Sequence, residues 1–158
     1  MDLAPTAEQE AFRAGCGAWL EANVEQPPSR AGLDETVVWG QAWQRRLARA
    51  GLVGVTWPVE YGGRELSALH HFIVQEELAR SRSPELVGRI GLNLVGPTLL
   101  AHGAEQQKRR WLPAILDATE LWCQLFSEPG AGSDLAGLTT RAVRDDADGG
   151  WRLHGQKL

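Results

Sequence analysis

Residues 124–134 read QLFSEPGAGSD, and the hydrophobic pattern of the chain changes at this stretch. Upstream of residue 120, apolar residues recur at the three- and four-residue spacing of amphipathic helices. From Leu121 onward the apolar runs are short and separated by turn residues, which is typical of strands. The sequence therefore predicts a mainly α fold, with a helical domain over residues 1–120 and the first strands of a β domain over residues 121–158.

The upstream helices carry recognisable start and stop signals. Thr6 and Gln9 stand at capping-box spacing at the start of a helix over residues 6–24. Asp34 is expected to cap a second helix, which Gly51 ends. We expect an irregular connection over residues 52–66 and further helices over 67–82, 86–95 and 97–117, the last interrupted at Gly103. Together these helices should form a bundle.

Downstream of the quoted stretch the sequence predicts at most three strands. The run LWCQLFS at 121–127 is one, and residues 139–146 and 150–158 are two more, joined at DADGG. Trp151 and Leu153 alternate with polar residues, so one face of the last strand should be buried. Because the chain ends inside that strand and leaves open sheet edges, we expect the sequence to stop in the middle of a domain.

Composition and charge narrow the functional classes. The 158 residues carry a formal net charge of −4 without a long block of like charge, which argues against a nucleic-acid footprint. No apolar run is long enough to span a bilayer, and the start of the chain is acidic, so we expect a cytoplasmic protein. Cys16 and Cys123 lie far apart without metal-binding spacing, which predicts two unpaired, partly buried thiols and no metal site.

The glycines after Glu128 are the strongest chemical signal. Gly130 and Gly132 could take positive φ and point backbone N–H groups at a phosphate, with the Ser133 hydroxyl as a further donor. The same residue types also form ordinary tight turns, so both interpretations stand. Glu128 has no partner at a spacing that would tune it as a base, and a surface or structural role is expected.

Other polar residues point to ordinary surface or packing roles. His70 and His71 are adjacent on a helix and cannot bind one metal ion together, so they are expected at the surface or the edge of the core. Lys108, Arg109 and Arg110 are expected to form a solvated helix face. The residues alone therefore identify no catalytic group.

The segments QLFSEPGAGSDLAGLTTRA at 124–142 and GWRLHGQKL at 150–158 closely resemble the acyl-CoA dehydrogenase family of flavoproteins. Upstream, GLVGVTWPVEYGG, IVQEELAR and the stretch from GPTLLAHG to the quoted loop resemble the family in the same order. The resemblance implies the family's N-terminal helical domain followed by the opening strands of its middle β domain.

The same resemblance implies FAD as cofactor and an acyl-CoA as substrate. The segment is expected to run along the flavin, with the Ser127 hydroxyl at the pyrimidine edge of its ring and Ser133 near the pyrophosphate and the acyl-CoA. The cofactor-binding residues implied by the resemblance are Gln124, Leu125, Phe126, Ser127, Gly132 and Ser133, and Ser133 is also implied in substrate binding.

The family implies dehydrogenation of the α,β bond of the acyl thioester to a trans-2-enoyl thioester. An electron-transfer flavoprotein or similar acceptor and a homo- or hetero-oligomer are implied with it. No segment here matches the family's catalytic glutamate, or the W-[IV]-[TS] stretch that follows GQK, so the isolated chain is expected to be inactive. Two alternatives remain open: a non-catalytic helical assembly or partner subunit, and the N-terminal part of an acyl-CoA oxidase or flavin monooxygenase.

Overall fold

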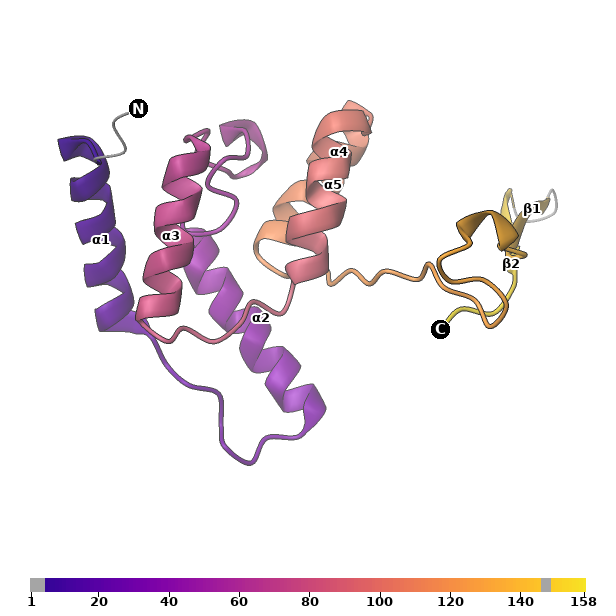
Figure 1. The fold of residues 1–158 in the computed structure, drawn as a ribbon, viewed down its shortest axis with the longest axis horizontal. Coiled ribbons are helices and arrows are strands. Elements are labelled where there is room, and N and C mark those ends of the chain that lie inside the picture. The colour runs from indigo at the N-terminus through magenta and orange to yellow at the C-terminus, as the bar shows by residue number, and fades with distance from the viewer. Residues whose placement is uncertain (1–4, 146–148) are drawn as a thin grey trace. The chain divides into compact units, whose positions relative to one another are not determined.

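Helices dominate the first part of the chain (Figure 1). The structure is a computed structural model that describes residues 5–145 and 149–158. The chain divides into two compact units, Met1–Trp122 and Cys123–Leu158. Within the described residues the first unit holds the α-helices α1 (Ala7–Asn23), α2 (Leu33–Arg49), α3 (Ala68–Arg80), α4 (Gly96–His102) and α5 (Glu105–Leu116). The predicted mainly α fold with a short β segment is confirmed.

The helix starts follow local capping chemistry. The backbone N–H of Gln9 donates to the Thr6 hydroxyl at 3.2 Å, and the Gln9 side chain accepts from the Thr6 N–H at 2.8 Å, so the predicted capping box is confirmed. The prediction that Asp34 caps α2 is wrong, because Gly32 is the N-cap. Asp34 instead lies in the first turn of α2, where its negative charge interacts favourably with the partial positive charge of the unpaired N–H groups at the helix start.

The segment between α3 and α4 departs from the predicted helix over residues 86–95. Residues 83–86 are not helical, and a π-helical turn, η2 (Gly91–Val95), runs directly into α4. Pro97 has no amide hydrogen to donate to Asn93, which is consistent with the wider turn before it. The expected interruption at Gly103 is confirmed, since α4 ends at His102 and α5 begins at Glu105.

The core of the helical unit forms between α1, α2, α5 and the 52–66 connection. Its most completely buried side chains include Leu20, Trp43, Leu47 and Leu112. In the connection, Gly54 has a φ of +61°, and a β-carbon there would lie 2.2 Å from a methyl group of Leu116. Glycine at this position therefore lets the connection pack against α5.

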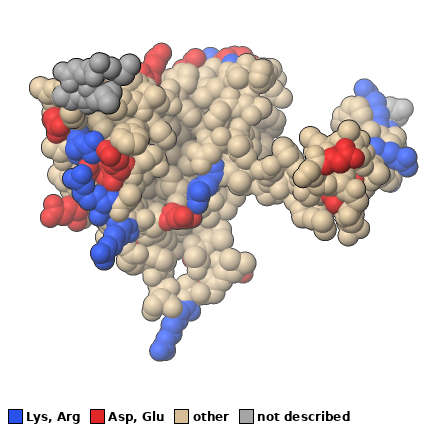
Figure 2. Space-filling model, viewed as in Figure 1, with Lys and Arg blue, Asp and Glu red and all other residues tan. Residues whose placement is uncertain are grey.

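Charged side chains of both signs lie next to one another on the face shown in Figure 2. In the basic run on α5, Arg109 pairs with Glu105 at 2.7 Å, and Arg110 pairs with Glu120 at 2.5 Å. Both arginines are more than half exposed, so the expected solvated face is confirmed for them, whereas Lys108 is half-buried. Exposed pairs of this kind contribute little to stability.

The second unit contains one antiparallel strand pair. Strands β1 (Arg141–Asp145) and β2 (Gly150–His154) pair with Arg141 opposite His154 and Asp145 opposite Gly150. Residues 146–148, which belong to the predicted DADGG turn, lie outside the described residues. The expected buried face is wrong, because Trp151 is 67% and Leu153 74% exposed. Two strands alone offer no second layer against which such a face can pack.

The predicted strand over residues 121–127 is also wrong. Residues 121–127 carry no strand assignment, and Leu125 and Phe126 are 55% and 59% exposed. An apolar run becomes a strand only where another strand completes its backbone hydrogen bonds, and among the described residues this run accepts one backbone bond alone, at the Ser127 carbonyl from the Leu158 N–H. Cys123 is exposed, whereas Cys16 is buried, and burial raises the pKa of the Cys16 thiol. Both thiols are free, as expected, but the expectation that both are partly buried is wrong for Cys123.

Candidate functional site

The loop over residues 124–133 consists of an exposed extended strip and a tight turn. Glu128 and Ala131 exchange two backbone hydrogen bonds, of 2.8 and 3.1 Å, around Pro129 and Gly130. Neither Gly130 nor Gly132 has a positive φ, so the predicted phosphate nest built on left-handed glycines is not formed. Pro129 fixes a negative φ at the first central position of the turn but leaves Gly130 free to take either sign, and in this structure Gly130 is not left-handed.

Glu128 is the one member of this loop whose side chain is charged and buried. Its Oε2 accepts from the backbone N–H and the hydroxyl of Thr139, both at 2.8 Å. Its Oε1 accepts from the Thr140 N–H at 2.9 Å and pairs with the Lys157 ammonium at 3.0 Å. The side chain is 4% exposed. A surface or structural role was expected for Glu128, and of these two the structure shows the structural one.

These contacts also set the charge state of Glu128. Hydrogen bonds from Thr140 and Thr139, with the Lys157 ammonium beside them, hold the pKa of the Glu128 carboxyl well below its ordinary range. Burial acts in the opposite direction but is outweighed. At neutral pH the group is therefore a carboxylate.

This lowered pKa predicts that the 123–158 unit is sensitive to acid. A depressed folded-state pKa stabilises the fold above the ordinary glutamate pKa of about 4.5, and this contribution is lost as the pH falls toward the folded value. We expect the Glu128 carboxyl carbon, followed by NMR, to titrate well below pH 4.5, with the Thr139 and Thr140 amide signals shifting in parallel. The Glu128→Gln variant, which has no carboxyl here, is the control. A midpoint in the ordinary glutamate range would contradict the contacts.

The implied cofactor residues lie together on the exposed part of this loop. Gln124, Leu125, Phe126 and Ser127 are consecutive and exposed, and Gly132 and Ser133 are exposed beyond the turn. Within the part of the chain that the structure describes, the hydroxyls of Ser127 and Ser133 make no hydrogen bond. A β-carbon at Gly132 would meet no atom within 4 Å. Free donors, exposed apolar side chains and an open glycine fit a flat cofactor with polar edges.

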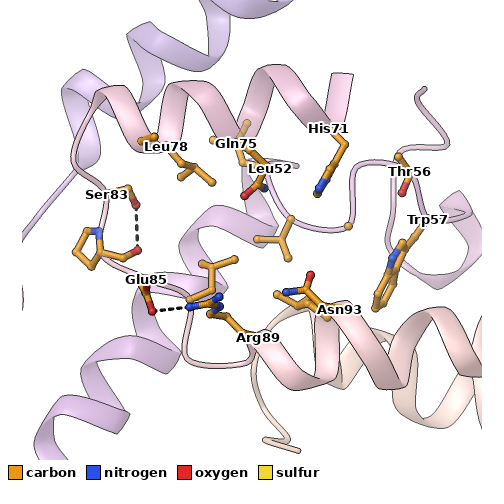
Figure 3. A pocket seen from close by; sticks show the side chains of 16 residues that line it. Leu52, Thr56, Trp57, His71, Gln75, Leu78, Ser83, Glu85, Arg89 and Asn93 are labelled. Carbon is orange, nitrogen blue, oxygen red and sulfur yellow. Dashed lines mark hydrogen bonds and ion pairs between the residues drawn. The ribbon is translucent and has the colours of Figure 1, made fainter. Parts of the chain in front are cut away.

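A cavity of about 440 Å³ lies in the helical unit, between α3, the 52–57 segment and residues 83–93 (Figure 3). Trp57, Leu78 and Leu92 supply apolar walls. Figure 3 shows His71 and Gln75 on α3 facing the segment that carries Arg89 and Asn93. This volume and this mixture of apolar walls with a few polar groups are typical of small-molecule sites.

Sequence reasoning did not identify this cavity. His71 was expected at the surface and is exposed, but its position on the cavity wall depends on how α3 faces residues 83–93. His70 lies at the core edge, where its ring meets Phe12 edge-on at 4.9 Å. Residue types alone gave no signal for the cavity, because its lining comes from three separate segments.

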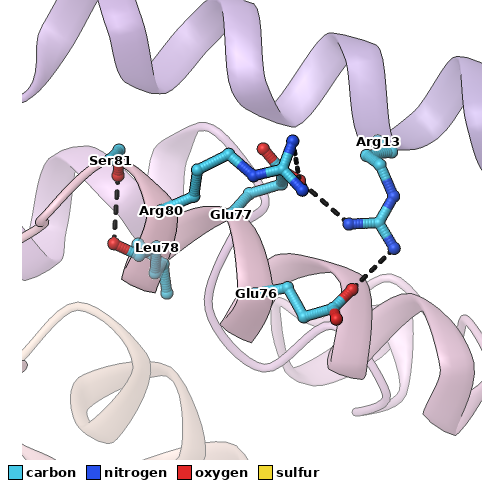
Figure 4. Close-up of polar contacts among 6 residues, drawn as sticks. All are labelled: Arg13, Glu76, Glu77, Leu78, Arg80 and Ser81. Atoms are coloured by element: carbon cyan, nitrogen blue, oxygen red, sulfur yellow. Dashed lines mark hydrogen bonds and ion pairs between the residues drawn. The ribbon is translucent and has the colours of Figure 1, made fainter.

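A second polar cluster joins α1 to α3 (Figure 4). Arg13 pairs with Glu76 at 2.6 Å and with Glu77 at 2.9 Å, and Arg80 approaches Glu77 at 3.7 Å. The Glu77 side chain is 5% exposed, and its partners neutralise it. Since these side chains satisfy one another, the cluster serves helix packing and leaves no group free for chemistry.

Comparison with known proteins supports the assignment. Residues 6–119 match the family model described as "Acyl-CoA dehydrogenase, N-terminal domain". The chain belongs to the acyl-CoA dehydrogenase family. The acyl-CoA dehydrogenase IpdE1 of Mycobacterium tuberculosis is 46% identical over 156 residues, which cover 94% of this chain and 40% of that protein.

Solved structures agree with this family assignment. The ChsE4-ChsE5 complex of Mycobacterium tuberculosis matches with a TM-score of 0.76 and 32% identity, covering 100% of this chain and 39% of that one. A protein described as "Tcur3481-Tcur3483 steroid ACAD" matches with a TM-score of 0.66 and 34% identity, covering 92% and 38%. The chain thus spans about 40% of the length of these family members.

Among the described residues, no helix is both long and apolar enough to cross a membrane.

Proposed function

We propose that the whole protein is an FAD-dependent acyl-CoA dehydrogenase that converts an acyl-CoA to the trans-2-enoyl-CoA. The observation that carries this proposal is the 46% identity, over nearly all of the chain, to a relative that is itself named an acyl-CoA dehydrogenase. In this proposal the helical unit is the N-terminal domain, and Cys123–Leu158 begins the middle β domain. We also propose a cytoplasmic location, which rests on the sequence alone.

The proposed flavin-binding residues are Gln124, Leu125, Phe126, Ser127, Gly132 and Ser133. FAD, when bound, supplies the acceptor for the hydride that leaves the substrate's β-carbon. The Ser127 hydroxyl, free and exposed in this structure, would lie beside the pyrimidine edge of the ring, as the family resemblance implies. There it would donate a hydrogen bond to an oxygen or nitrogen that gains negative charge. The exposed Leu125 and Phe126 side chains would exclude water from that edge.

The cavity in the helical unit is the proposed place for part of the acyl group. Its volume of about 440 Å³ suits a bulky acyl group, and His71, Gln75 and Asn93 offer hydrogen bonds to oxygen functions on it. The description of one solved relative, at 34% identity, contains the words "steroid ACAD". We therefore infer that polycyclic acyl-CoA thioesters are a substrate class of the whole protein. Simple fatty acyl-CoAs are the substrates to test beside them.

The proposed assembly is a homo- or hetero-oligomer that passes electrons to an electron-transfer flavoprotein or a similar acceptor. The ChsE4-ChsE5 relative is itself described as a complex, which supports assembly between related chains. Two other functions would give different results with purified protein. A non-catalytic partner subunit would bind no flavin, and an oxidase or monooxygenase would reoxidise rapidly with O₂ after reduction.

The Ser127→Ala variant of the full-length protein tests the proposed flavin contact. We expect weaker FAD binding or slower flavin reduction, because a hydrogen bond to a developing charge is worth about 1.5–3 kcal/mol, roughly ten- to a hundredfold in affinity or rate. FAD affinity and stopped-flow reduction rates measure it, and Ser29→Ala, at an exposed serine of the helical unit, is the matched control. Unchanged affinity and unchanged reduction rate would rule out the role of Ser127.

A further inference from the structure

We propose that Glu128 and Lys157 form a clamp that fixes the Phe126–Ser127 strip in the conformation that binds the cofactor. The inference rests on the proposed function and adds two positioning residues to it, neither of which was identified in the sequence as part of the site. It starts from one feature of the strip: residues 124–127 have no regular secondary structure, and no strand among the described residues pairs with them. Something other than a sheet must hold them.

The acceptor positions of Glu128 are filled. A carboxylate offers about four lone-pair positions, and four donors from Thr139, Thr140 and Lys157 occupy them at 2.8–3.0 Å. No position remains to take a proton from a substrate. Glu128 is therefore suited to hold structure and not to act as the base of the reaction.

Lys157 extends the clamp to the strip itself. Its ammonium donates to the Phe126 carbonyl at 3.0 Å while it pairs with Glu128, also at 3.0 Å. The backbone N–H of the next residue, Leu158, donates to the Ser127 carbonyl at 3.0 Å. Two consecutive carbonyls of the strip are thus held by two consecutive residues, and the Ser127 hydroxyl stays free.

The clamp gathers three segments that are separate in sequence. Glu128 belongs to the loop, Thr139 and Thr140 precede β1, and Lys157 follows β2. The Lys157 side chain is 21% exposed and the Glu128 side chain 4%, so the pair is largely shielded from water. A charge-assisted contact is stronger in such a shielded position than at an exposed surface. Removing the ammonium would leave a shielded carboxylate with only neutral donors.

The first test uses the full-length protein and its affinity for FAD. We expect Lys157→Met to raise the FAD dissociation constant about tenfold, because the strip must then be ordered during binding, while Lys157→Arg, which keeps the charge, restores most of the affinity. The control is Lys108→Met, at the other lysine of this chain and outside the clamp, which should leave the FAD dissociation constant unchanged. A lower melting temperature with unchanged FAD affinity would show a merely structural pair and overturn the proposal.

The second test does not depend on flavin. In the 158-residue chain without FAD, we expect Lys157→Met to speed hydrogen exchange at the Glu128, Ala131 and Leu158 amides, whose own partners it leaves intact. Unchanged exchange at all three would overturn the clamp. If the full-length wild-type protein binds no FAD, the proposed function fails, and the exchange result still decides whether the clamp exists.

The Glu128→Gln variant should show the same weaker FAD binding and the same faster amide exchange. If Glu128→Gln does not fold, the Lys157→Met results decide alone.

Discussion

Replacing Gln44 with leucine will destabilise the helical unit by about 3 kcal/mol, because it leaves the buried Leu116 carbonyl and Gly88 N–H without their partner and removes one of the bonds to the Ile115 carbonyl. The Gln44 side chain is completely buried in the middle of α2. Its Nε2 donates to the carbonyls of Ile115 and Leu116 at 3.0 and 3.1 Å, and its Oε1 accepts from the Gly88 N–H at 2.9 Å. One amide thus joins α2 to the end of α5 and to the segment before α4.

Leucine is similar in volume, so the expected loss comes from hydrogen bonds and not from a cavity. Gln41→Leu is the matched control: Gln41 is on the same helix, is only partly buried and makes a single bond of 2.7 Å to the Ala118 carbonyl. Urea unfolding followed by tryptophan fluorescence should separate the two variants clearly. Equal, small losses would show that the three contacts of Gln44 contribute little.

The helical part of the fold was largely predictable, for local reasons. The Thr6–Gln9 capping box and the break at Gly103 depend on residues close in sequence, and both are confirmed. Gln44 shows where such reasoning ends. Nothing near it in sequence indicates that a glutamine should be buried, because its partners lie 44, 71 and 72 residues away.

The β segment was less predictable because strands depend on partners far away in sequence. LWCQLFS has strand composition, but no strand among the described residues pairs with it, and Trp151 and Leu153 alternate with polar residues yet are both more than half exposed. The same limit applied to the site. The sequence left a surface and a structural role open for Glu128, and only the fold shows its bonds to Thr139, Thr140 and Lys157.

The 158-residue chain alone will purify without stoichiometric FAD. The proposed strip contacts the cofactor along one side only, and its apolar side chains are more than half exposed here. Association costs several kcal/mol in lost freedom of motion, about 4 kcal/mol at the least, and half a set of contacts does not offset it. This chain covers about 40% of the length of its relatives, which are therefore about two and a half times as long. We expect the rest of the protein to supply the remaining contacts to FAD.

One comparison tests the central claim directly: the visible absorbance of the full-length protein and of the 158-residue chain, each purified and then titrated anaerobically with fatty and polycyclic acyl-CoAs. We predict that the full-length protein shows the spectrum of bound oxidised flavin and loses it on addition of an acyl-CoA, while the 158-residue chain is colourless. A full-length protein that is colourless, or whose flavin spectrum no acyl-CoA changes, would contradict the assignment as an FAD-dependent acyl-CoA dehydrogenase.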